Sequence, residues 1–194
     1  MDRRSNNIAI FQDSMDLIKA NQKLQQAVQF SIQNQKLYVP SQAIALPEPG
    51  KSSCKTIVSS KRSFEAASAY AKAGKRVCVL NFASATNPGG GVTRGSTAQE
   101  ECLCRCSTLY PCLDTKTMWH QFYQPHRKAG DPRYNDDLLY TPEVVVFKTD
   151  TSAPERMEEK DWYQVDIITC AAPNLRKKPS NAMNPSAGNA PVKI

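Results

Sequence analysis

The chain has 194 residues, of which 40% are hydrophobic and 22% are charged, and its net charge is +7. These values exclude the disordered and fibrous classes and fit one soluble globular domain with a sizeable core. No apolar stretch is long enough to span a bilayer, and acidic residues interrupt the segment after the basic start at 1–7. We therefore expect no membrane partner and a cytoplasmic location.

The excess of positive charge favours an anionic partner through long-range attraction. Basic residues lie scattered along the chain at 61–62, 72, 75–76 and 176–178. Nucleic acid and other anionic polymers would be attracted alike, and a solvated basic surface has the same composition. Charge alone therefore does not identify the partner.

The N-terminal region has the pattern of a helical extension. Apolar residues recur at helical spacing over 8–18, and polar helix formers continue over 22–35. Prolines and a glycine between 40 and 50 end this pattern, and the β-branched residues 56–58 predict a short strand. We expect an extension over 1–50, a main domain over 51–178 and, from its Asn, Pro, Ser and Gly content, a flexible tail over 179–194.

The main domain alternates between strand and helix patterns. The alanine-rich segment 63–73, followed by Gly74, predicts a helix. It leads into a near-continuous apolar run at 76–82, which is typical of a buried strand in a parallel sheet. The apolar runs 144–147 and 165–170 predict two central strands.

A glycine loop directly follows the first of these strands, at residues 87–91. Its three glycines allow positive φ angles and a close approach of the backbone to a ligand. Open α/β sheets bind ligands at the carboxyl ends of their strands, which is where this loop would lie. A tight turn is the alternative reading of the same glycines.

Seven residues after the loop, Gln99, Glu100 and Glu101 begin a segment that is predicted to be helical over 98–109. Paired carboxylates beside a ligand loop are suited to acid–base chemistry. Acidic side chains in a first helical turn also complement the helix dipole, so a structural reading stays open.

Four cysteines, at 102, 104, 106 and 112, come closest to a metal-binding pattern. Their spacing lacks the two-residue gaps and histidine partners of structural zinc sites, and the total of seven is odd. We expect buried reduced thiols and no metal site. The aromatic run 119–123 is suited either to stacking a base or to packing under a loop, and no triad motif surrounds any Ser or Cys.

The combined sequence of 80–91, 99–101 and 103–107 resembles the bacterial-type poly(ADP-ribose) glycohydrolase family. The segments 144–150 and 165–175 follow in the order and approximate spacing of that family, so the resemblance spans most of 5–176. It implies an α/β fold, a macrodomain-like mixed sheet flanked by helices with a helical N-terminal extension. Family members continue with another helix, a strand and a second glycine-rich loop, so we expect this chain to lack the family's C-terminal part.

The resemblance implies hydrolysis of ribose–ribose O-glycosidic bonds in poly(ADP-ribose), which releases ADP-ribose. It implies that Glu101 is the catalytic acid and that Glu100 binds the ribose hydroxyl groups. The substrate-binding residues that it implies are Gly89, Gly90, Gly91, Gln99, Asn81 and Asn87. The glycines would bind the terminal ribose and the diphosphate, and Gln99 would help to shape the loop.

The chemistry suits these residue types. Breaking the bond requires a proton on the leaving oxygen, which a glutamate of raised pKa supplies at neutral pH. We expect repulsion from Glu100 to raise the pKa of Glu101. The resemblance implies no cofactor and no metal, because backbone amides and a helix N-terminus can hold phosphates.

The implied partner is poly(ADP-ribose) or an ADP-ribosylated macromolecule, with no direct nucleic-acid binding. Two alternatives remain open. The chain would be a non-catalytic ADP-ribose-binding module, or an inactive truncated relative in which the glycines only end a strand and the glutamates only cap a helix.

Overall fold

A four-stranded mixed sheet lies at the centre of the computed structural model, which describes residues 2–42 and 54–174. Its order is β1-β3-β4-β2, formed by β1 (Lys36–Tyr38), β2 (Cys78–Ala83), β3 (Leu138–Val146) and β4 (Tyr163–Ala171). β2 and β4 are parallel, whereas β3 pairs antiparallel with both β1 and β4. This is the mixed sheet flanked by helices that the resemblance implied.

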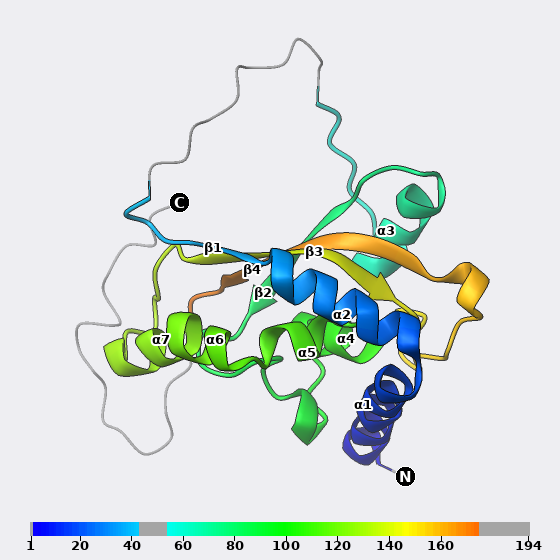
Figure 1. Ribbon diagram of the computed structural model, residues 1–194, viewed down its shortest axis with the longest axis horizontal. Coiled ribbons are helices and arrows are strands. Elements are labelled where there is room, and N and C mark those ends of the chain that lie inside the picture. Colours follow the sequence, from blue (N-terminus) through cyan, green and yellow to red (C-terminus); the bar gives the residue numbers. More distant parts are fainter. Residues whose placement is uncertain (1, 43–53, 175–194) are drawn as a thin grey trace.

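Helices lie on both sides of the strands (Figure 1). They are α1 (Arg3–Ala20), α2 (Gln22–Asn34), α3 (Ser63–Lys72), α4 (Gln99–Cys106), α5 (Leu109–Leu113), α6 (Lys116–Met118) and α7 (Gln124–Ala129). Single turns of 3₁₀-helix occur at Val92–Arg94 and Glu159–Asp161, and a π-helical turn at Trp119–Tyr123. In Figure 1, α4 to α7 lie below the strands and α3 lies above them.

The two N-terminal helices pack against the rest of the fold. Asp2 caps α1 by accepting hydrogen bonds from the N–H groups of Arg4 and Ser5. Phe11 of α1 is buried in the main core, and Leu24 of α2 joins a second cluster with Val145 of β3 and Phe147. The predicted helices over 8–18 and 22–35 are confirmed. The expected boundary at residue 50 and the expected tail at 179–194 lie outside the described residues.

The structure corrects three local expectations. Residues 56–58 form no strand, and the side chains of Ile57 and Val58 are 72% and 93% exposed. No strand in the described part of the chain lies beside them, and β propensity depends on such neighbours. The short strand β1 was not anticipated. The strand predicted at 76–82 exists as β2, but among the described strands it lies at the edge of the sheet, and its side chains Leu80 and Phe82 are 45% and 59% exposed.

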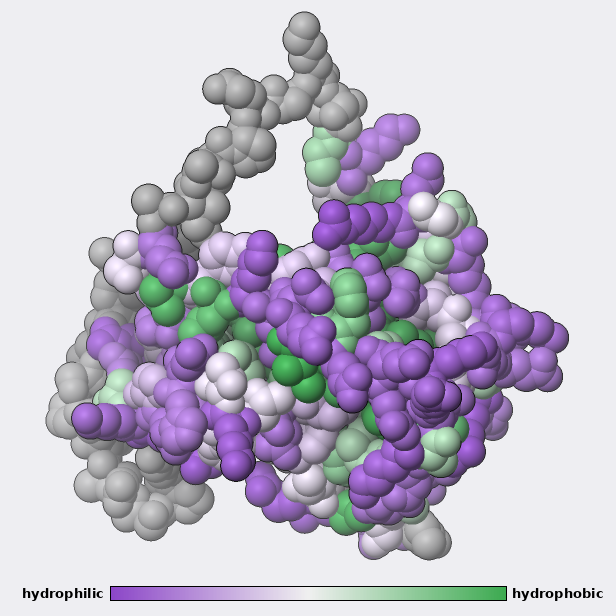
Figure 2. Space-filling view, viewed as in Figure 1, coloured by the Kyte–Doolittle hydropathy of each residue, from purple (hydrophilic) through white to green (hydrophobic). Residues whose placement is uncertain are grey.

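The core lies between the sheet and α4 to α7. Leu103, Cys104 and Cys106 of α4 are fully buried, and so is Cys112 of α5. Buried reduced thiols are thus confirmed at these three cysteines, while Cys102 is half-buried. Figure 2 shows that hydrophilic side chains cover most of the face that it displays, because the helices turn their apolar sides inward.

Residues 2–42 and 54–174 contain neither a metal-binding cluster nor a membrane-spanning helix. In these ranges no group of three or more His, Cys, Asp or Glu side chains is arranged to hold a metal ion. Within the same ranges, every helix is too short or too polar to cross a membrane.

Candidate active site

The glycine loop lies at the carboxyl end of β2, where Ala83 pairs with Ala171 at the end of β4. Gly89 and Gly90 have φ angles of 62° and 59°, in the left-handed region that favours glycine. The N–H of Gly90 donates to the carbonyl of Asn87 at 3.0 Å, which closes the turn. The sequence prediction of a glycine loop at a strand end is therefore confirmed.

The two glutamates of α4 are turned onto this loop. Glu101 Oε1 accepts a hydrogen bond from the N–H of Gly91 at 2.8 Å, and Glu100 Oε2 accepts one from the N–H of Ser84 at 2.8 Å. A Cβ at Gly90 would lie 2.6 Å from Glu101 Oε1 and 3.1 Å from Glu100 Oε2. Because Gly90 has no side chain, both carboxylates can pack against the backbone of the loop.

Both carboxyl groups are buried, with exposed fractions of 3% for Glu100 and 6% for Glu101. Glu100 Oε1, Glu101 Oε2 and Asn81 Oδ1 are buried and have no hydrogen-bond partner among the described residues. Burying a polar atom without a partner costs free energy, and native proteins keep few such atoms. Three such acceptor atoms at one site are suited to hydroxyl or N–H donors.

Burial raises the pKa of Glu100 to about 7, and the negative charge of Glu101 adds to this. The N–H of Ser84 and the side chain of Asn81 act in the opposite direction. The raised pKa of Glu100 was not anticipated from the sequence. The cause is burial of Glu100 in the fold, which the local sequence does not reveal.

The side chain of Gln99 lies at the edge of β2 and makes hydrogen bonds to the β2 backbone that a neighbouring strand would otherwise make. Its Oε1 accepts from the N–H of Phe82 at 2.9 Å, and its Nε2 donates to the carbonyl of Leu80 at 2.7 Å. Nε2 also donates to Ser63 Oγ at 3.0 Å. The side chain therefore fastens the first turn of α4, which carries both glutamates, to the sheet.

The two asparagines occupy different positions. Asn81 is fully buried on β2, donates from Nδ2 to Thr169 Oγ1 at 3.2 Å and lies beside Glu100. Asn87 is half-buried in the loop, where its Oδ1 accepts from Arg127 Nη2 at 2.6 Å. Asn81 thus adjoins the carboxylates, and Asn87 lies on the loop itself.

Sequence reasoning missed two residues that hold the loop. Arg127 of α7 donates from Nε to the carbonyl of Thr86 at 2.6 Å, and its guanidinium stacks on Trp119 at 4.8 Å from the ring centre. The ring of Tyr110 borders Gly89, since a Cβ there would lie 2.7 Å from Tyr110 Cδ2. Trp119 belongs to the aromatic run that the sequence singled out, but no local pattern connects Arg127 with a loop 40 residues earlier.

Comparison with known proteins places this geometry in a family. A family model described as the microbial-type PARG catalytic domain matches residues 8–149. No curated protein matches the chain.

Several solved structures have the same fold. The crystal structure of poly(ADP-ribose) glycohydrolase (PARG) from Thermomonospora curvata is 30% identical, with a TM-score of 0.74 over 88% of this chain and 65% of that one. The same enzyme bound to the inhibitor ADP-HPD is 29% identical, with a TM-score of 0.68 over 95% and 69%. PARG from Deinococcus radiodurans in complex with ADP-ribose is 32% identical, with a TM-score of 0.65 over 76% and 58%.

The chain thus spans 65% of the first of these structures and 58% of the Deinococcus protein. The matched region contains the glycine loop, both glutamates of α4 and most of the sheet. Because the family model covers more than half of the chain, the chain belongs to the microbial-type PARG catalytic-domain family.

Proposed function

We propose that this chain hydrolyses ribose–ribose O-glycosidic bonds in poly(ADP-ribose) and releases ADP-ribose, with Glu101 as general acid and base. One observation carries the proposal: two buried carboxylates at the start of α4 are hydrogen-bonded to the backbone between β2 and the end of the glycine loop, Glu100 to Ser84 and Glu101 to Gly91. The solved relatives that share this fold are poly(ADP-ribose) glycohydrolases, and one of them is bound to ADP-ribose.

The orientation of Glu101 suits a proton donor. Gly91 holds Oε1 in place, which leaves Oε2 for the bond to be cleaved. The protonated carboxyl group gives its proton to the leaving ribose oxygen as positive charge develops on the other sugar. The carboxylate that results then takes a proton from the incoming water, so one residue acts first as acid and then as base.

Glu100 acts on the same sugar without transferring the proton. Its oxygen Oε1 has no partner within the described part of the chain and is free to accept a ribose hydroxyl. With a pKa of about 7, Glu100 is partly protonated at neutral pH, which reduces the negative charge beside Glu101. Reduced charge lowers the repulsion between two carboxylates that share one site.

The remaining roles belong to the scaffold of the site. The backbone of Gly89, Gly90 and Gly91 binds the terminal ribose and the diphosphate through amide groups, without a metal or a cofactor. Asn81 and Asn87 contact ribose, and Gln99 shapes the site by fastening α4 to β2. We also propose that the protein is cytoplasmic. In this proposal the chain consists of an N-terminal extension at 1–50, a glycohydrolase domain at 51–178 and a tail at 179–194.

The test is release of ADP-ribose from poly(ADP-ribose) by the purified chain, with ADP-ribose binding measured by calorimetry on the same sample. We expect Glu101→Gln to abolish release and keep binding, because the amide preserves size but cannot deliver the proton. Glu155→Gln is the matched control, since Glu155 is exposed and its side chain makes no hydrogen bond in the described structure. Unchanged turnover in Glu101→Gln would contradict the assigned role.

Two other outcomes identify the alternatives. Binding of ADP-ribose without release by the unaltered chain identifies a binding module. Neither binding nor release, from a folded sample, identifies an inactive relative, in which the glutamates and glycines have only structural roles.

A further inference from the structure

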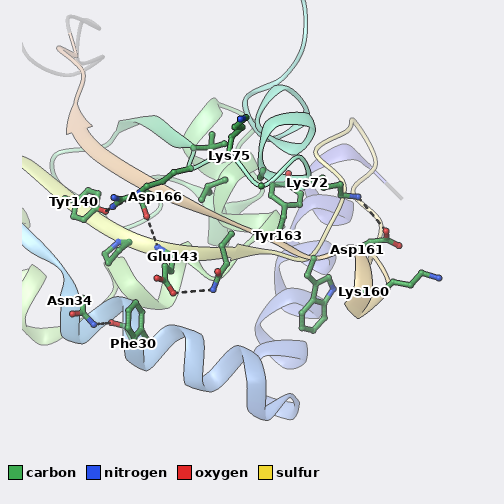
Figure 3. Close-up of a pocket in the computed structure, with 18 of the residues that line it drawn as sticks. Phe30, Asn34, Lys72, Lys75, Tyr140, Glu143, Lys160, Asp161, Tyr163 and Asp166 are labelled. Carbon is green, nitrogen blue, oxygen red and sulfur yellow. Dashed lines mark hydrogen bonds and ion pairs between the residues drawn. The ribbon is translucent and has the colours of Figure 1, made fainter. Parts of the chain in front are cut away.

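A second groove lies at the opposite end of the sheet from the glycine loop. It has a volume of about 1020 Å³ and runs between α2 and the end of α3 (Figure 3). Its floor is formed by the beginning of β4 and by the middle of β3. Because the glycine loop follows the carboxyl end of β2, which is parallel to β4, this groove cannot be part of the candidate active site.

Basic residues from several elements line the groove. Its lining includes five cationic residues, Lys36, Lys72, Lys75, Arg76 and Lys160, and three acidic residues, Glu143, Asp161 and Asp166. Arg76 Nε donates to Asp166 at 2.9 Å, and Lys72 lies 3.7 Å from Asp161. Lys36 and Lys75 have no ion pair and no side-chain hydrogen bond in the described structure, so they present free positive charge.

The floor of the groove is built by a hydrogen-bond network. Asp166 is 7% exposed and accepts from Tyr140 Oη at 2.8 Å and from the N–H of Glu143 at 3.1 Å. Glu143 occupies an irregularity in β3 with a φ of 52°, a left-handed conformation that costs a non-glycine residue about 1–2 kcal/mol. Ser31 Oγ donates to the carbonyl of Pro142 at 2.7 Å and ties α2 to this point. The network fixes the shape of the groove.

α2 forms one side of the groove and contributes an aromatic ring to its lining. Phe30 is 43% exposed, lines the groove and lies on the same helix as Asn34 (Figure 3). An exposed aromatic ring and free cations along one groove are the features that stack a base while its phosphates are neutralised. The groove therefore fits a ligand that combines phosphates with aromatic bases.

We propose that this groove binds ADP-ribose units of poly(ADP-ribose) that lie away from the bond being cleaved. The proposal rests on the proposed function, which brings the polymer to the protein. Each unit offers two phosphates to Lys36 and Lys75 and an adenine to Phe30. A domain of this length has a radius of gyration of about 16 Å, so a polymer of several units reaches from the loop to the groove. Its covalent continuity gives these units a high effective concentration there.

Charge reversal in the groove tests the proposal. The double variant Lys36→Glu/Lys75→Glu is compared with Lys19→Glu/Lys55→Glu, which changes the net charge equally at exposed lysines outside the groove lining. Binding of fluorescent long poly(ADP-ribose) is measured by polarisation at several salt concentrations, and binding of monomeric ADP-ribose by calorimetry.

We expect the groove variant to bind long polymer more weakly, with a slope of log affinity against log salt reduced by about 1.4, the value for two phosphate contacts on a single strand. Its binding of monomeric ADP-ribose stays unchanged, and the control variant behaves like the original chain. Phe30→Ala, at an exposed position, weakens polymer binding about fivefold or more.

Equal losses in the two double variants would overturn the proposal, because general charge attraction would then explain them. A loss of single-stranded DNA or RNA binding without a loss of polymer binding would also overturn it and identify a nucleic-acid site. Groove-dependent polymer binding by a chain that neither binds nor releases ADP-ribose would support the groove and refute the proposed function.

Discussion

Replacing Glu100 by Gln should change how the stability of the protein depends on pH. The pKa of Glu100 rises from 4.5 in the unfolded chain to about 7 in the folded protein, mainly through burial. A group with a raised folded pKa binds protons more tightly in the folded state, so the stability it contributes is present below pH 4.5 and is lost as pH rises toward 7. The loss corresponds to about 3 kcal/mol of unfolding free energy, of which about 2.5 kcal/mol falls between pH 5 and pH 8.

The glutamine in Glu100→Gln carries no titrating proton, so this loss disappears. The new amide keeps the size of the carboxyl group, and its oxygen can still accept from the N–H of Ser84. We expect the variant to be more stable than the original chain at pH 8, by about 2.5 kcal/mol, and to differ little from it at pH 5.

The assay is urea denaturation at pH 5, 6, 7 and 8, comparing the original chain with Glu100→Gln and with the exposed control Glu155→Gln. Subtracting the two curves at each pH cancels the titration of all other groups, as long as the substitution leaves them unperturbed. A difference that does not change with pH, or one that matches the control, would refute the reasoning that burial holds a proton on Glu100.

Three further predictions concern the loop and the reaction. Gly90→Ala should lower the free energy of unfolding by about 1–3 kcal/mol and abolish ADP-ribose release, because the new methyl group collides with the Glu101 carboxylate. The control is Gly74→Ala, at a position with a φ of 71° and open space around it. It should lose only the free energy that a left-handed backbone costs a residue with a side chain. Release should change as pH rises through about 7, since Glu100 loses its proton there and places a negative charge beside Glu101, and a rate that stays flat from pH 6 to pH 8 would contradict this. Arg127→Ala should raise the KM for polymer more than it lowers kcat, because the loop loses two hydrogen bonds, and Arg127→Lys should restore part of the loss.

The sequence predicted the elements whose patterns are long or strongly apolar. α3, β2, β3 and β4 were identified from runs of alanine or of β-branched residues, and the loop after β2 from its glycines. β1 was missed because three residues directly after a helix carry no alternating pattern. Residues 56–58 were assigned wrongly because a strand needs a partner, which local composition cannot supply.

The candidate site divides in the same way. The loop and the two glutamates lie within 15 residues of one another, so a local reading brought them together. Arg127 reaches the loop from α7, and Gln99 reaches the edge of β2; both contacts depend on how distant segments pack. The raised pKa of Glu100 is also a tertiary property, because it follows from burial rather than from the adjacent charge alone.

The position of the carboxylates distinguishes the structural reading of the glutamates from the functional one. An acidic residue that only complements the dipole of α4 needs no burial and contributes about 0.3–1 kcal/mol. At pH 8, the burial of Glu100 lowers the free energy of unfolding by about 3 kcal/mol, which exceeds the stabilisation from the helix dipole. A protein that needed only a helix cap would leave this side chain in water, as most acidic side chains are. Burial of the two carboxylates is explained if the fold holds them against the glycine loop to contact a ligand. The unfolding free energy of Glu100→Gln measures what this burial costs, and the turnover of Glu101→Gln measures whether the site is catalytic.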